Sequence, residues 1–268
     1  MIGVARSGYY AWRRCRESVR TLENKQLTVA IRQAFKESRE TYGSPRVFHL
    51  LRRQGYRCGR HRVARLMRAA NLRAVQRRAF RVTTVTNAMN VAPNRLQQRF
   101  HAAVPNRIWT SDITYIATQE GWLYLAVMLD VYSRRVVGWS MQEQLADGLV
   151  TAAFEAAWMQ RRPQAGLLVH SDRGFQYCGQ RFREVLSKNA CVQSMSATGN
   201  CYDNAVTETF FHTLKVELVN RLRFQSRSDA RKCIFEYIES FYNRQRLHST
   251  LGYKSPLEFE ENSLTAKS

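Results

Sequence analysis

The apolar pattern near the start of the chain predicts a small helical domain over residues 24–72. Within 24–40, apolar residues recur three and four positions apart, which is the spacing of one helix face. They are Leu27, Ala30, Ile31, Ala34 and Phe35. Residues 1–23 precede this domain as an N-terminal extension.

Two further helices are predicted downstream in the same domain. Pro45 is suited to the first turn of a helix that ends near Leu51. The chain breaks around Gly55 and Gly59, and a helix over 59–70 follows. Its apolar side carries Val63, Leu66, Met67 and Ala70. Two short helices around a glycine-containing turn are typical of a helix-turn-helix.

The pattern changes twice after this domain. Residues 73–106 hold neither a helical nor a strand period over any long window, and Pro93 and Pro105 interrupt them, so they are predicted to be a linker. From residue 107 the chain is rich in β-branched and aromatic residues, and strands are predicted for three consecutive segments. These segments are 107–118, 121–133 and 134–142. Their close spacing predicts an antiparallel meander.

Helices and strands then alternate, with a helix over 145–160, a strand ending at 172, a helix over 180–189 and a strand over 192–197. A meander followed by this alternation predicts an α/β fold with a mixed five-stranded sheet flanked by helices. Helices over 204–221 and 228–244 follow. Regular structure is expected to end at Ser255-Pro256, so the core spans 107–260 and a tail spans 261–268.

Charge divides the chain in the same place. The 268 residues carry a net charge of +21, of which residues 1–100 hold +19, with 23 Lys and Arg against 4 Asp and Glu. A strongly basic face binds polyanions, because each neutralised phosphate releases counterions. Nucleic acid is favoured over anionic lipid, since the arginines are interleaved with apolar helical positions. The outward positions of the 59–70 helix, which suit groove or phosphate contacts, are Arg60, His61, Arg62, Arg65 and Arg68. The alternative is an ordinary helical hairpin with a cationic outer face.

Three carboxylates carry the candidate chemistry of the core. Asp112 lies within the first strand, Asp172 at the end of the fourth, and Glu208 on the helix that follows the sheet. Lys215 and His212 share a strip of that helix with Glu208, and Asp203 suits its N-cap. Converging carboxylates repel unless a cation neutralises them, and oxygen ligands suit Mg²⁺ or Mn²⁺. Such ions support in-line phosphoryl displacement.

The alternative reading makes these acids separate surface groups. Asp172 alone could belong to a turn, and Glu208 alone to a solvated helix face. His170, two residues before Asp172, points to the same strand face by alternation and could support the carboxylates. Cysteine and histidine spacing gives no zinc pattern, and no apolar run is long enough to cross a membrane.

Five ordered segments resemble the DDE transposase and retroviral-type integrase core, a branch of the RNase H-like fold. They are WTSDITYI around Asp112, LDVYSRRVVGW (129–139), HSDRGFQY around Asp172, GNCYDNAVTETFFHTLK (199–215) and FYNRQRLHSTLGYKSPLEF (241–259). In particular, the chain is similar to downstream-frame transposases of two-frame bacterial insertion sequences. The upstream YGSPRV and GYRCGRHRVARLMR segments resemble the helix-turn-helix-like region of the same proteins.

The resemblance implies roles for individual residues. Asp112, Asp172 and Glu208 would bind Mg²⁺ or Mn²⁺ and catalyse cleavage at the ends of the element, after which the released 3′-OH attacks target DNA. Lys215 would hold the DNA end. Partners would be terminal-repeat and target DNA, a second copy in a synaptic complex, and an upstream-frame product or fusion, with no membrane partner. The expected location is the bacterial cytoplasm, at the nucleoid.

Two other functions remain open from the sequence. One is a non-catalytic DNA-binding regulator of the same fold that requires an upstream-frame partner, because the short start of this chain carries no heptad repeat. The other is an RNase H-like nuclease, which shares the acids but would not predict the YNRQRLHSTLGYKSP segment.

Overall fold

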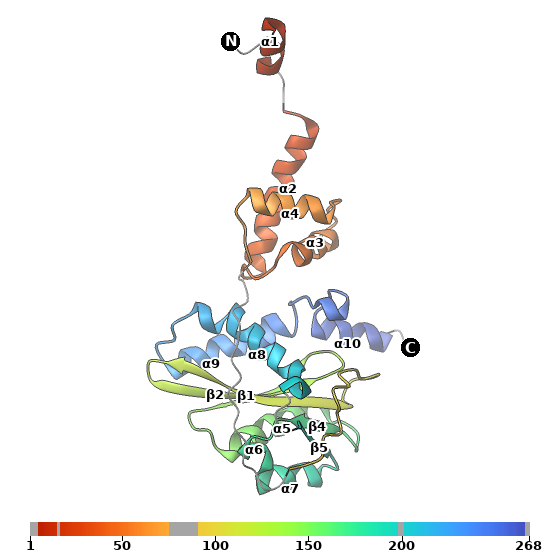
Figure 1. The fold of residues 1–268 in the computed structure, drawn as a ribbon, viewed down its shortest axis with the longest axis vertical. Coiled ribbons are helices and arrows are strands. Elements are labelled where there is room, and N and C mark those ends of the chain that lie inside the picture. Colours follow the sequence, from red (N-terminus) through yellow and green to blue (C-terminus); the bar gives the residue numbers. More distant parts are fainter. Residues whose placement is uncertain (1–4, 15–16, 75–90, 198–200, 266–268) are drawn as a thin grey trace. The chain divides into compact units, whose positions relative to one another are not determined.

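A computed structural model describes residues 5–14, 17–74, 91–197 and 201–265. The chain forms two compact units, residues 1–75 and 76–268, which are considered separately (Figure 1). Residues 75–90 of the linker predicted over 73–106 lie outside the described residues.

The first unit consists of helices. They are α1 (Arg6–Arg14), α2 (Val19–Glu37), α3 (Ser44–Arg53) and α4 (Arg60–Ala69). α2 begins earlier than predicted, because Ser18 caps it by accepting a hydrogen bond from the Thr21 N–H. The five apolar residues predicted for its inner face are all buried. α3 and α4 occupy the predicted positions, so the helix-turn-helix-like arrangement is confirmed.

The second unit is built on a mixed sheet with strand order β3-β2-β1-β4-β5. The strands are β1 (Ile108–Thr118), β2 (Gly121–Asp130), β3 (Val136–Gln142), β4 (Leu168–Ser171) and β5 (Val192–Met195). β1, β2 and β3 pair in antiparallel fashion, whereas β4 is parallel to both β1 and β5. The predicted meander and five-stranded sheet are therefore confirmed.

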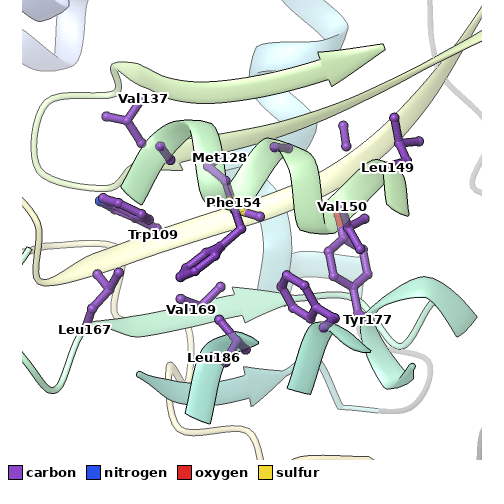
Figure 2. Close-up of a cluster of buried hydrophobic side chains, with 14 of the residues drawn as sticks. Trp109, Met128, Val137, Leu149, Val150, Phe154, Leu167, Val169, Tyr177 and Leu186 are labelled. Carbon is purple, nitrogen blue, oxygen red and sulfur yellow. The ribbon is translucent and has the colours of Figure 1, made fainter. Parts of the chain in front are cut away.

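Helices cover both faces of this sheet (Figure 1). One layer holds α5 (Asp147–Arg161), α6 (Phe175–Cys178) and α7 (Gln180–Lys188). The other holds α8 (Ala205–Glu217) and α9 (Arg227–Glu236). A cluster of buried apolar side chains lies between the sheet and the first layer, and it includes Trp109, Met128 and Phe154 (Figure 2). The Asp112 side chain points to the opposite face of the sheet from Trp109, toward α8, as does Thr110 two residues earlier.

Gly138 sets the close approach of β3 to α5. A Cβ placed there would lie 2.5 Å from the Ala153 carbonyl oxygen and 2.5 Å from the Ala157 nitrogen. Gly138→Ala is expected to reduce the free energy of unfolding by roughly 1–3 kcal/mol or more, because helix and strand must separate. Chemical denaturation measures this loss. Gly148→Ala, whose Cβ would meet nothing closer than 3.7 Å, is the control and should not destabilise the protein. Equal stability of both variants would contradict this account of the packing.

The C-terminal region differs from the prediction. α9 continues as a π-helical segment, Tyr237–Tyr242. The two together cover most of the helix expected over 228–244. Regular structure does not end at Ser255-Pro256, because Pro256 begins a further helix, α10 (Pro256–Thr265). The expectation was wrong because proline also favours the first turn of a helix. Glu260 anchors α10 through a bidentate ion pair with Arg161, with both N–O distances 2.8 Å.

Residues 91–106 pack against the core rather than extending away from it. The backbone N–H groups of Arg95 and Leu96 donate to the Ser194 hydroxyl on β5, at 2.9 and 3.3 Å. The Asn94 side-chain amide donates to Asp203 at 2.8 Å. Leu96 is buried. The described part of the predicted linker is thus a component of the second unit.

Candidate active site

The register of β1 and β4 brings two carboxylates together. The parallel pairing runs from Ile108 with Leu168 to Thr110 with His170. Asp112 and Asp172 each lie two residues beyond the last pair, where the two strands separate. Because side chains two residues apart point the same way, both carboxylates lie at one place in the sheet. The sequence predicted this convergence of Asp112 and Asp172.

Backbone hydrogen bonds orient both carboxylates. The Asp112 carboxylate accepts from the N–H of Ile113 at 2.7 Å. The Asp172 carboxylate accepts from the N–H of Gly174 at 2.9 Å, in the turn before α6. A Cβ on Gly174 would lie 3.0 Å from that carboxylate oxygen, so a glycine here leaves room for the Asp172 side chain.

The start of α8 is fastened to β1 beside Asp112. The Asn204 side-chain amide donates to the Ser111 carbonyl oxygen at 3.0 Å. The Thr207 hydroxyl donates to the Thr110 hydroxyl at 2.7 Å. Glu208 is the next residue after Thr207, so these two bonds fix where it emerges from the helix. The Glu208 side chain is exposed, whereas His212 and Lys215 on the same side of the helix are half-buried.

Asp203 does not have the predicted capping role. The N-cap of α8 is Asn204, which makes no side-chain capping bond. The Asp203 carboxylate instead accepts from the Ala197 N–H and from Asn94, both at 2.8 Å. Asp203 therefore ties the end of β5 and the 91–96 segment to the approach to α8.

The three carboxylates influence one another electrostatically. Burial, followed by the charges of Asp172 and Glu208, raises the pKa of Asp112 well above its usual range; the Ile113 N–H and Lys215 oppose this. Burial also raises the pKa of Asp172. Burial and the charge of Asp172 raise the pKa of Glu208. A nearby cation would relieve this repulsion.

Lys215 lies on α8, the helix that bears Glu208. Burial lowers the pKa of its ammonium, and the charge of Asp112 opposes that shift. The Lys215 Nζ atom lies 5.0 Å from the centre of the Tyr115 ring, which is cation–π geometry. The ammonium thus interacts electrostatically with Asp112 and stacks over the Tyr115 ring.

The donor set fits a hard divalent cation in its chemistry. It contains only carboxylate oxygens, and their shared repulsion favours a bound positive charge. The present arrangement does not enclose an ion. Across residues 5–14, 17–74, 91–197 and 201–265, no three His, Cys, Asp or Glu side chains lie close enough together to hold one. Asp112 and Asp172 come from the ends of the paired part of β1 and β4, and Glu208 would complete the set from α8.

The structure places the two predicted supporting histidines differently. His170 is buried, and its Nδ1 atom lies 2.8 Å from the Ser194 hydroxyl on β5. Burial lowers its pKa to about 4, so the ring is neutral at physiological pH. It bonds within the sheet rather than to Asp172. His212 lies half-buried on α8, one turn after Glu208.

The predicted DNA-contacting residues of the first unit differ in exposure. Arg60, Arg65 and Arg68 are exposed on α4. Arg62 is half-buried, and its guanidinium pairs with Glu23 on α2 at 2.9 Å. It also donates to Asn24 at 2.8 Å. A contact from Arg62 to DNA therefore has to compete with these two bonds.

Sequence reasoning missed two residues that support the site. Tyr177 on α6 is buried, and its hydroxyl lies 2.8 Å from the Ser111 hydroxyl, next to Asp112. Burial and the charges of Asp112 and Asp172 raise its pKa well above the usual range, so the phenol stays protonated. Asn204 is the second, through its bond to the Ser111 carbonyl. Both stand inside the HSDRGFQY and GNCYDNAVTETFFHTLK segments, which were the available signal.

The helices of the described residues include none that is long and apolar enough to cross a membrane.

Comparison with known proteins gives consistent matches along the chain. Residues 102–201 and 208–264 match models described as integrase core domain, and residues 21–80 match one described as HTH-like domain. The insertion element IS600 uncharacterized 31 kDa protein of Shigella sonnei is 46% identical, over 97% of this chain and 96% of its own length. Transposase InsF for insertion sequence IS3A of Escherichia coli K12 is 43% identical, over 98% of this chain and 93% of its own.

A solved structure matches in fold. A chain of the simian T-cell lymphotropic virus intasome in complex with PP2A regulatory subunit B56 gamma has a TM-score of 0.50 at 13% identity. The match covers 76% of this chain and 67% of that one.

Proposed function

Since this chain belongs to the insertion-sequence transposases built on an integrase core domain, and so acts in DNA transposition, we propose that Asp112, Asp172 and Glu208 carry out its chemistry. The substrate is the DNA at the ends of the element. The reaction is cleavage of one phosphodiester at each end, followed by attack of the released 3′-OH on a phosphodiester of target DNA. No covalent bond between protein and DNA forms.

One observation carries the assignment of the residues. Asp112 and Asp172 stand side by side where β1 and β4 separate, and Glu208 extends from a helix fastened to β1 at Thr110 and Ser111. Carboxylates that raise one another's pKa values are costly in a structure, and such clusters concentrate at functional sites. When bound, a Mg²⁺ or Mn²⁺ ion would neutralise these oxygens and polarise the phosphodiester under attack.

The other residues hold the substrate. Lys215 binds a phosphate of the DNA end through its ammonium, which the Tyr115 ring keeps near Asp112. The exposed Arg60, Arg65 and Arg68 of α4 bind phosphates or groove edges further along the DNA. Bulk DNA affinity comes from the basic first unit, whereas positioning of the cleaved bond comes from the second. This activity places the protein at the bacterial chromosome, in the cytoplasm.

Metal dependence is the direct test of this chemistry. A labelled duplex carrying the element's terminal repeat should be nicked in Mg²⁺, with a free 3′-OH at the nick. Chelation with EDTA should abolish the product, and added Mg²⁺ or Mn²⁺ should restore it. Denaturing electrophoresis of the labelled strand measures the product. Cleavage that persists at the same rate in EDTA would contradict the proposed role of the carboxylates.

The same assay separates the other functions considered from the sequence. Binding of the duplex without any nick would indicate a regulator, and cleavage confined to an RNA–DNA hybrid would indicate an RNase H-like nuclease. Neither is favoured, because the relatives that match nearly the whole chain include named transposases. Synapsis of two element ends requires a second copy, and an upstream-frame product is a candidate partner; both remain proposals.

A further inference from the structure

We propose that Tyr115 and Trp122 form a stacking site for one unpaired base of the DNA, next to the phosphodiester at the carboxylates. This inference rests on the proposed function, because it concerns the substrate of the same site. The site is the open edge of β1 between Asp112 and the β1–β2 turn. Its occupant is a nucleobase that has left the duplex beside the cleaved bond.

The two rings form an exposed aromatic pair. Tyr115 on β1 and Trp122 on β2 are each 49% exposed, so about half of each ring surface is not covered by protein. Their ring centres are 5.0 Å apart at an interplanar angle of 86°. Tyr115 pairs with Tyr124 and Ala117 with Trp122, so the two rings are diagonal neighbours on one face of the hairpin. Large exposed aromatic side chains on a sheet are a common platform for unpaired bases.

Lys215 connects this pair to the active site. Its ammonium lies over the Tyr115 ring at 5.0 Å, and its charge interacts with that of Asp112. Tyr115 lies three residues after Asp112 on the same strand, so its side chain points to the opposite face of the sheet, and Lys215 of α8 interacts with both. A phosphate at Lys215 would therefore place its attached nucleoside within reach of Tyr115.

The edge of β1 is open at this point. β4 pairs with β1 only as far as Thr110, and in the part of the chain that the structure describes no other strand pairs with β1 on that side. Beyond the aromatic pair, the edge is closed again by the bridge between Thr118 and Phe224. The exposed Leu222 and Arg223 lie next to this bridge. The platform thus lies between Lys215 and the exposed Leu222 and Arg223.

The partial burial of the carboxylates gives such a platform a use. Asp112 and Asp172 are partly buried between strands and α8, so a phosphodiester in an intact stacked duplex reaches them poorly. Separating one base from the stack brings the backbone closer, at the cost of lost stacking. An aromatic pair beside the site offsets that cost by stacking the displaced base. A role confined to hairpin stability would not need rings that are half exposed.

The test combines changes in the protein with changes in the DNA. A terminal-repeat duplex is prepared with an abasic site at either base flanking the cleaved bond, and cleavage is measured for wild type and for Tyr115→Leu, Trp122→Leu and the double variant. Leucine keeps apolar bulk but removes the aromatic face. Each single variant should cleave the intact duplex about tenfold more slowly. On the abasic duplex that lacks the stacked base, Trp122→Leu should match wild type, because the partner of its ring is already absent, whereas Tyr115→Leu keeps the part of its loss that comes from releasing Lys215.

Fluorescence provides a readout independent of cleavage. With 2-aminopurine at the same position, the wild-type complex should be quenched by stacking, and the double variant should be brighter. Tyr115→Phe, which keeps the ring, should behave as wild type. Phe235→Leu is the matched control, because Phe235 is also exposed but pairs with Trp139 at the far side of the sheet. Thermal melting confirms that each variant is folded.

The outcomes separate this inference from the proposed function. If wild type cleaves in Mg²⁺ and Asp112→Asn does not, but Trp122→Leu loses the same factor on intact and abasic duplexes, the stacking site is wrong and the catalytic assignment stands. Unchanged fluorescence in the double variant would equally overturn it. If Asp112→Asn cleaves as fast as wild type, the catalytic assignment fails first.

Discussion

Replacing Asp112 by Asn is expected to reduce cleavage of terminal-repeat DNA roughly a thousandfold, which corresponds to about 4 kcal/mol of activation free energy. Asn keeps the size of the side chain but removes the negative charge that the bound cation requires. Asp172→Asn and Glu208→Gln should have effects of the same order, because the three side chains act on one phosphodiester. Single-turnover cleavage of the labelled duplex measures all three.

Stability measurements distinguish lost chemistry from lost structure. Burial and neighbouring carboxylates raise the pKa of Asp112, so its ionised form destabilises the metal-free fold at neutral pH. A folded-state pKa above the unfolded value means that this cost grows as pH rises between the two. Asp112→Asn should therefore melt no lower than wild type without Mg²⁺. Added Mg²⁺ should stabilise wild type and not the variant.

A matched acid outside the site provides the control. Glu155 is exposed on α5, and Glu155→Gln should cleave as wild type does. Equal product from wild type and from Asp112→Asn and Glu208→Gln would refute the assignment of the carboxylates.

The largest expected effect on stability concerns Glu217, at the C-terminal end of α8. Its carboxylate accepts from Arg246 at 2.7 Å and from the Tyr237 hydroxyl at 2.8 Å, and all three side chains are buried. Glu217→Gln removes one charge and leaves the other buried. Breaking a buried pair in this way costs about 3–5 kcal/mol, and urea denaturation of the second unit should show a loss of that size.

An exposed ion pair in the same unit gives the comparison. Arg227 and Glu143 are 3.1 Å apart, with the Glu143 side chain 58% exposed. Glu143→Gln should cost less than about 1 kcal/mol, because water screens the pair. A loss for Glu217→Gln as small as that for Glu143→Gln would show that Arg246 finds another partner. Because Glu217 holds the end of α8, its loss should also lower the temperature at which cleavage fails.

Local patterns in the sequence predicted most of the sheet. Strand propensity located β1 with Asp112 inside it, and the parallel β1–β4 register explains why Asp172 joins it. Helical periodicity predicted the buried face of α2 residue by residue. These features depend on neighbouring positions, which is the information that a single sequence contains.

The features that the sequence did not predict are contacts between distant segments. α10 was missed because Pro256 can either end or begin a helix, and the contacts of Glu260 with the distant Arg161 and Arg135 favour the second. Asp203 was assigned to a cap because Asp is common there, whereas its partners are Asn94 and Ala197. No local pattern reports such partners.

The hydrogen bond between Asn94 and Asp203 limits how far the chain can be truncated from its N-terminal side without losing contacts of the second unit. A fragment beginning at 107, where the strands begin, would lack the Asn94 amide and the two backbone N–H groups that bind Ser194. Buried Leu96 would leave a gap, and the approach to α8 would lose one of its ties. The shortest catalytic fragment that keeps these contacts begins near residue 91. Proteolytic trimming into this stretch would remove one of the ties that position the helix carrying Glu208 before it touched any strand of the sheet.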